Sequence, residues 1–226
     1  MEQREWTTQM TRQVGAQVAR LRTRPGPDGK RMTAQALADR CAELGLPMDR
    51  SVIAKLEKGL RQSISVAELI ILAKALEVAP VRLLFPLEEQ GTIEILPGRK
   101  VPIWRAAEWF DGTDDLALEA EGWDPNVWRR PDQIVLSFRW HRRYLESWSA
   151  GQKLMAQQRA EAEAAATAED KNALMDVVAH NEQLQDKTAQ DLGRVRRNMR
   201  QLGVAQLPEI PPELRSIDLL PLDPEP

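Results

Sequence analysis

The sequence predicts a mainly α-helical protein with an N-terminal five-helix domain and a C-terminal domain that contains a long helical hairpin. Three observations support this fold class. Residues that favour helices, such as Ala, Leu, Glu, Gln and Arg, are plentiful, whereas strong β signals are scarce. Apolar residues recur at spacings of three and four over most of the chain, which is typical of helices with one buried side. Strand-like alternation is limited to TIEIL at residues 92–96.

Bulk composition indicates a soluble globular protein. Hydrophobic residues make up 42% of the chain and charged residues 29%, which is ordinary for folded domains. The single cysteine excludes an internal disulfide and fits a reducing compartment. The first ten residues lack the apolar segment of a signal peptide, and no apolar run approaches membrane-spanning length. We therefore expect a cytoplasmic protein with no membrane association.

The first predicted helix covers about residues 6–21. Its apolar residues step by fours and a three and line one side; they are Trp6, Met10, Val14, Val18 and Leu21. Residues 23–31, TRPGPDGKR, hold two prolines and two glycines and are expected to form a basic loop.

Residues 33–59 predict two short helices joined by a polar corner. Thr33 is a suitable N-cap for the first of them, whose core side carries Leu37, Cys41 and Leu44. Cys41 is therefore expected to be a buried core thiol. Gly45 and Pro47 end this helix, and Asp49 is placed to cap the next.

The second of these helices, residues 50–58, separates its side chains by angle. Ile53 and Leu56 fall on one side, at about 100° per residue. The opposite side carries Arg50, Ser51, Ala54, Lys55 and Lys58. A helix with one apolar side and one cationic side can rest on a core and present its outer face to an anionic partner. The major groove of DNA admits such a helix, and Arg and Lys can reach guanine there.

A capping box and two further helices complete the N-terminal domain. Ser65 and Glu68 predict the start of a helix over residues 66–76. Its expected core residues are Leu69, Ile70, Leu72, Ala73 and Leu76. A short last helix follows Pro80 and ends at Phe85.

The segments SVIAKLEKG, SISVAELIILAKALEV and VRLLF, in this order and spacing, resemble the lambda-repressor-like (XRE-type) helix-turn-helix family, which includes phage repressors. The resemblance covers roughly residues 10–86 and implies a DNA-binding domain over residues 1–86. The distance from Leu37 to Ile53 is longer than is usual in the family, so the corner before the second helix is extended or the first helix has an extra turn.

Site residues follow from this reading. Arg50, Ser51 and Lys55, on the outer face, are expected to read bases. By resemblance, the turn after that helix contacts phosphates, which assigns this role to Lys58, Arg61 and Gln62. The charge distribution agrees with this assignment. The whole chain carries −3, but residues 1–86 hold 14 Lys and Arg against 9 Asp and Glu, a net charge of +5.

Residues 87–100 are expected to be a linker with one short strand, and residues 101–206 a helical domain. Six of the seven Trp lie between Trp104 and Trp148, which indicates a second small core. Arginines among these aromatic residues leave open a second nucleic-acid surface on a monomer. Residues 207–226, rich in Pro and acidic residues, are expected to be a disordered tail.

Two long helices with heptad-like spacing are predicted within the C-terminal domain. The first starts near Ile134 and carries Phe138, His141, Leu145, Trp148, Gln152 and Met155. The second covers about residues 171–202 and carries Leu174, Val177, Asn181, Leu184, Thr188, Leu192, Val195, Met199 and Leu202. Several of these positions are polar, so we expect an antiparallel hairpin or coiled coil that pairs with a second copy to form a homodimer. The arginines at 194, 196, 197 and 200 are expected to face solvent.

Motifs of catalysis, cofactor binding and metal binding are absent from the sequence, and His141 and His180 lack ligand-like spacing. We therefore expect no enzyme activity, cofactor or metal. The sequence predicts a transcriptional regulator that binds specific double-stranded DNA sequences, most simply a repressor that occupies promoter or operator DNA. The alternative is an antitoxin-type interaction module whose C-terminal half binds a partner protein.

Overall fold

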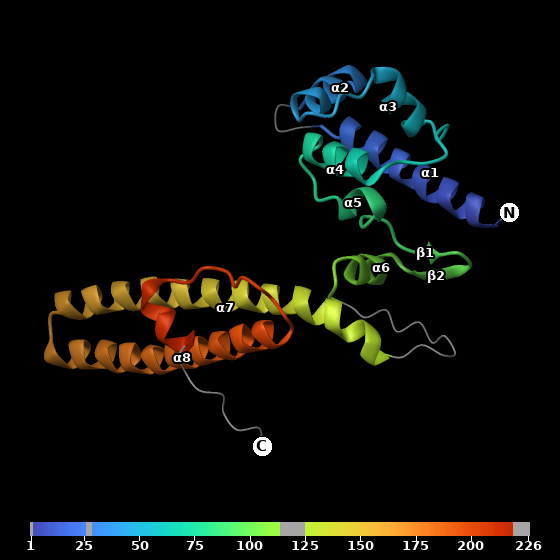
Figure 1. The fold of residues 1–226 in the computed structure, drawn as a ribbon. Helices are drawn as coiled ribbons and strands as arrows, with labels where there is room; N and C mark the ends of the chain where they lie inside the picture. The colour runs from blue at the N-terminus through green and yellow to red at the C-terminus, as the bar shows by residue number, and fades with distance from the viewer. Residues whose placement is uncertain (1, 26–28, 114–124, 219–226) are drawn as a thin grey trace. The chain divides into compact units, whose positions relative to one another are not determined.

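The computed structural model describes residues 2–25, 29–113 and 125–218 (Figure 1). The chain divides into two compact units, Met1–Leu116 and Ala117–Pro226. Both units are mainly helical in the described residues, and the second contains a long helical hairpin. The predicted mainly α class and the C-terminal hairpin are therefore confirmed.

In its described residues the first unit contains five helices, then a two-stranded sheet and a sixth helix. The elements are α1 (Glu2–Thr23), α2 (Ala34–Glu43), α3 (Arg50–Glu57), α4 (Val66–Ala75), α5 (Val81–Leu84), β1 (Thr92–Leu96), β2 (Arg99–Pro102) and α6 (Ile103–Phe110). Helices α2 and α3 follow one another through the six-residue segment 44–49 (Figure 1).

The core of the first unit gathers one side of each of α1 to α5. Its least exposed members are Val14, Val18, Leu37, Cys41, Ile53, Leu56, Leu72 and Leu83. Burial raises the pKa of the Cys41 thiol, as expected for a core cysteine. The prediction for Ile70 is wrong, because its side chain is 53% exposed while Leu69 and Leu72 occupy the core side of α4.

Helix caps agree with the sequence in two of three places. The Thr33 hydroxyl accepts a hydrogen bond from the Ala36 amide at 3.0 Å, and Ser65 and Glu68 form the predicted capping box. Asp49 occupies the N-cap of α3, but its side chain makes no capping hydrogen bond. The first amides of α3 are thus left without a side-chain cap from this residue.

The predicted linker packs within the first unit. Strands β1 and β2 form an antiparallel hairpin, with Ile93 and Ile95 buried. The Trp6 indole nitrogen of α1 donates to the Glu94 carbonyl at 3.1 Å, and Phe110 of α6 meets Phe85 edge-on at 5.8 Å between ring centroids. The first unit therefore continues beyond residue 86, through the hairpin and α6.

The second unit is built on α7 (Pro125–Ala164) and α8 (Ala168–Gln201), which lie antiparallel (Figure 1). Gly151 of α7 faces the Gln185 side chain of α8, whose nitrogen would lie 1.8 Å from an added Cβ atom. Near this point Asn181 donates to the Gln158 side-chain oxygen at 2.9 Å.

The buried side of α8 agrees only in part with the predicted heptad seam. Leu192 and Met199 are buried as predicted, but Val178 is buried in place of Val177, and Val177 and Leu184 are 46% and 49% exposed. On α7, Phe138 is 40% exposed, while His141 and Met155 are buried. The apolar spacing therefore locates the helices but does not identify every residue that faces inward.

The chain after α8 returns to the hairpin. Residues 212–218 form the 3-10 helix η1 (Pro212–Asp218), and its Leu214 and Ile217 pack with Leu192 of α8. The prediction of disorder from residue 207 is therefore wrong for this described part of the tail.

Arg196 holds this segment in place and is itself only 5% exposed. Its guanidinium makes two hydrogen bonds of 2.8 Å to the Asp218 carboxylate and one of 2.8 Å to the Pro208 carbonyl. It also donates to His141 Nε2 at 2.8 Å, because a guanidinium has no acceptor. The prediction that Arg196 faces solvent is wrong.

The contact with His141 predicts that the stability of the second unit depends on pH. Burial, together with the neighbouring Arg196 charge, lowers the pKa of His141, whereas Asp218 raises it by a smaller amount. The unfolded chain therefore takes up a proton at higher pH than the folded chain does. We expect the free energy of unfolding to fall as pH drops below about 6.5, toward the lowered pKa.

Replacement of His141 with Gln tests this, because an amide oxygen still accepts from Arg196 but does not titrate. Hydrogen exchange of residues 207–218 should accelerate between about pH 7.5 and 5.5, relative to the intrinsic rate, in the wild type but not in His141→Gln. The exposed His180 on α8 provides the control, and His180→Gln should keep the wild-type response. An unchanged pH response in His141→Gln would contradict the assignment.

Candidate nucleic-acid interface

The outer face of α3 carries the residues that sequence analysis assigns to base reading. Ile53 and Leu56 are fully buried, and Arg50, Ser51 and Lys55 are exposed on the other side of the helix. Lys58 continues this face at the C-cap. Within the described residues, the side chains of these four polar residues make no hydrogen bond or ion pair.

A groove of about 420 Å³ runs between α2 and the start of α3. Gln35 and Asp39 of α2 line one side, with a hydrogen bond of 2.8 Å between them, and Arg50 and Ser51 line the other. Asp49 also lies in the lining. Charge on this face is therefore mixed at the start of α3 and positive toward Lys55 and Lys58. The sequence did not predict that Asp39 of α2 lies beside Arg50 and Ser51.

Arg61 differs from the other residues of the predicted site. It forms two hydrogen bonds with the Glu68 carboxylate, at 2.7 and 3.1 Å, and this contact lowers the pKa of Glu68. Gln62 is exposed, and its backbone carbonyl accepts from the Thr11 hydroxyl at 3.3 Å. The structure thus places Arg61 in an ion pair that a phosphate would have to displace.

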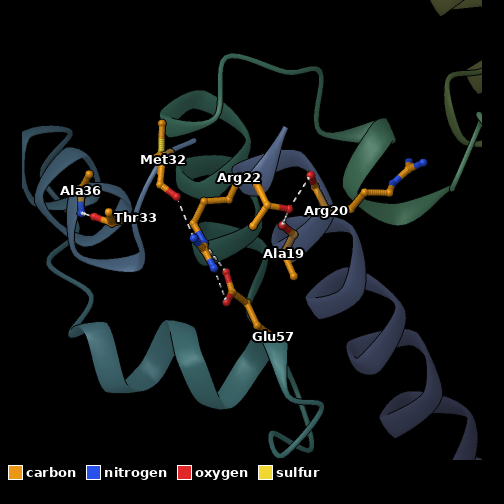
Figure 2. Close-up of polar contacts among 8 residues, drawn as sticks. Ala19, Arg20, Arg22, Met32, Thr33, Ala36 and Glu57 are labelled. Carbon is orange, nitrogen blue, oxygen red and sulfur yellow. Dashed lines mark hydrogen bonds and ion pairs between the residues drawn. The ribbon is translucent and has the colours of Figure 1, made fainter. Parts of the chain in front are cut away.

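Arg22, near the end of α1, contacts the last residue of α3 (Figure 2). Its guanidinium meets the Glu57 carboxylate at 2.6 and 2.9 Å and donates to the Met32 carbonyl at 2.7 Å. Both side chains are at most 15% exposed, and the hydrogen bond to Glu57 raises the pKa of Arg22. One side chain therefore joins α1, the segment before α2, and α3.

Helix α1 also meets α3 through its backbone. A Cβ atom added at Gly15 would lie 2.1 Å from the Leu56 carbonyl oxygen, so only glycine allows this approach. The absence of a side chain at Gly15 and the paired hydrogen bonds between Arg22 and Glu57 together set the position of α3 against the core. Spacing alone could reveal neither contact, because each joins residues 35 or more positions apart.

Other arginines of the first unit are engaged in ion pairs. Arg20 and Arg82 both contact Glu88, which lowers the pKa of that carboxyl to about 2. These pairs lie away from α3 in the sequence and neutralise charge elsewhere on the unit. Unlike these paired arginines, the exposed cations of α3 are available to an external anion.

Comparisons of the chain with protein-family models, curated proteins and solved structures find no match. In the described parts of the chain, no group of three or more His, Cys, Asp and Glu side chains is arranged to hold a metal ion. Among the described helices, none combines the length and apolar character needed to cross a membrane.

The Arg22–Glu57 contact predicts a stability effect. Glu57→Gln leaves the guanidinium partly buried against a neutral partner, so the first unit should lose about 1–3 kcal/mol of unfolding free energy. Hydrogen exchange read from peptides of α1 and α3 would measure it. Glu43→Gln, at an exposed position on α2, removes the same charge and should cost much less. Equal losses of unfolding free energy in the two variants would show that the Arg22–Glu57 contact does not hold α3 in place.

Proposed function

We propose that residues 1–86 act as a five-helix, lambda-repressor-like helix-turn-helix domain, and that the protein is a transcriptional regulator that binds specific double-stranded DNA sequences. The observation that supports this most is the outer face of α3. Three cations and a serine stand exposed there without partners in the described chain, on a helix whose other side is fully buried. A cationic face on a rigid helix is suited to the major groove.

The residues divide by expected contact. Arg50, Ser51 and Lys55 would read base edges, and Lys58 and Gln62 would hold phosphates at the end of the helix. Arg61 remains assigned to a phosphate, but it must exchange Glu68 for that phosphate. Occupation of promoter or operator DNA by such a domain would repress transcription by excluding polymerase.

A homodimer would place two such helices on two half-sites, about 34–36 Å apart. The exposed apolar residues of the hairpin, Leu154, Val177 and Leu184, would provide the contact between copies. Leu184→Asp should then weaken the dimer, whereas Met175→Asp should not, because position 175 is rotated by about 200° from position 177. A monomer mass for the wild type by light scattering at high micromolar concentration would contradict the dimer. In that case the same residues would favour the antitoxin-type alternative, with a partner protein on this surface.

Binding experiments can separate the proposed roles. Arg50→Ala should cost about 1–3 kcal/mol on the best-bound duplex and much less on a scrambled duplex, because base contacts are lost. Lys58→Ala should weaken both duplexes equally and reduce the slope of log affinity against log salt by about one. Arg61→Ala should have a smaller effect than Lys58→Ala, since its charge is already paired.

Titration of each variant at several salt concentrations would measure these differences. Lys74→Ala, an exposed position on α4 outside the proposed surface, controls for the loss of one positive charge. Equal loss on both duplexes in Arg50→Ala would identify Arg50 as a phosphate contact. Binding that is unchanged in all of the α3 variants would exclude α3 as the DNA-binding element.

A further inference from the structure

A cleft of about 620 Å³ lies in the first unit, apart from the groove between α2 and α3. The end of α1, the segment before α2, and the turn between α4 and α5 surround it. Ala36 and Arg40 form its wall on α2, whereas Gln35 and Asp39 face the other groove. The two sites are thus separated by roughly a third of a turn around α2.

Positive charge is concentrated around this cleft. Its lining includes the basic side chains Arg22, Arg24, Lys30, Arg31, Arg40 and Arg82, against one acidic side chain, Glu77. Arg22 is paired with Glu57, and Arg82 shares Glu88 with Arg20. The side chains of Arg24, Arg31 and Arg40 still outnumber Glu77, so the cleft keeps a net positive charge.

Three of the arginines are available to a ligand. Arg24 and Arg31 are exposed, and their side chains make no hydrogen bond or ion pair with any described residue. Arg40 donates to the Ala75 carbonyl at 3.1 Å, but its contact with Glu77 is long, at 3.5 Å, and Glu77 is mostly exposed. Guanidinium groups bind phosphate through paired hydrogen bonds, so this cluster suits a phosphate group.

The remaining wall of the cleft is apolar. Leu21, Met32, Leu76 and Val78 line it, and each is partly buried against the core of the unit. A concave site of this volume with an apolar wall and convergent charges is typical of small-ligand sites. A bare inorganic anion would leave the apolar wall unused.

We propose that this cleft binds a small organic phosphate of nucleotide size. Arg24, Arg31 and Arg40 hold the phosphate groups, and the apolar wall at Met32 and Leu76 receives the organic part. Arg22 lines the cleft and also holds Glu57 of α3, so a ligand bound in the cleft would affect the position of α3. An effect on DNA binding by α3 rests on the proposed function, whereas binding of the ligand itself does not.

Isothermal titration calorimetry of the full chain with ADP, pyrophosphate and adenosine tests the site. ADP should bind at a single site, and adenosine should bind at least about tenfold more weakly because it lacks the phosphates. Pyrophosphate should also bind more weakly than ADP, since it makes no contact with the apolar wall. Arg24→Gln combined with Arg31→Gln should reduce ADP affinity by at least about tenfold.

Two further variants keep the test specific. Glu77→Gln removes the acidic side chain of the lining and should tighten ADP binding by about two- to threefold. Lys100→Gln removes an exposed cation from β2, outside the cleft and outside α3, and should leave ADP affinity unchanged. The proposal is overturned if ADP fails to bind at about 1 mM, or if Lys100→Gln weakens binding as much as the cleft variants do. It is also overturned if the cleft variants weaken duplex DNA binding while ADP does not bind, because the arginines would then belong to a DNA surface.

Discussion

The position of α3 depends on one guanidinium group. Arg22 reaches from the end of α1 to the Glu57 carboxylate at the end of α3, and to the Met32 carbonyl just before α2. Gly15 removes the side chain that would otherwise hold α1 away from the Leu56 carbonyl. With both contacts in place, Ile53 and Leu56 reach the core and the opposite side of α3 faces outward. A helix that must present side chains with sub-ångström accuracy needs this kind of support.

In the second unit a different arginine connects segments that are distant in the sequence. Arg196 is buried between α7, α8 and the returning segment, and Asp218, His141 and the Pro208 carbonyl satisfy its guanidinium. In both units, therefore, a shielded arginine joins segments that are distant in the sequence. Exposed cations such as Arg50 and Lys55 do not connect segments of the chain in this way, so their charge is available to a binding partner. This division between structural and available cations is the physical basis of the proposed function and of the proposed ligand site.

Sequence reasoning reached the helices, the buried side of α3 and two caps, because local spacing and capping chemistry determine those features. It missed what depends on long-range contacts. Val177 fits a heptad seam, but Val178 is the buried one of the two, and the spacing of apolar residues does not distinguish them. Arginine is usually found at the surface, so the sequence places Arg196 there. Its burial depends on an ion pair with Asp218, which lies far from it in the sequence.

The same limit applies to the candidate site. The exposure of Arg50, Ser51 and Lys55 follows from helical angle, so the sequence could predict it. The pairing of Arg61 with Glu68 joins a residue in the turn before α4 to the capping residue of that helix, and no helical spacing predicts it. The cleft beside Arg24 and Arg31 could not be found at all, because its walls come from four separate segments.

The central claim is that the outer face of α3 recognises specific DNA sequences. Selection of bound molecules from a pool of random duplexes, with the full chain, tests that claim most directly. The account predicts enrichment of one motif with two half-sites related by two-fold symmetry and about one helical turn apart. Arg50→Ala should lose the enrichment at the base pairs that Arg50 contacts. A selected pool no different from the starting pool would contradict the account.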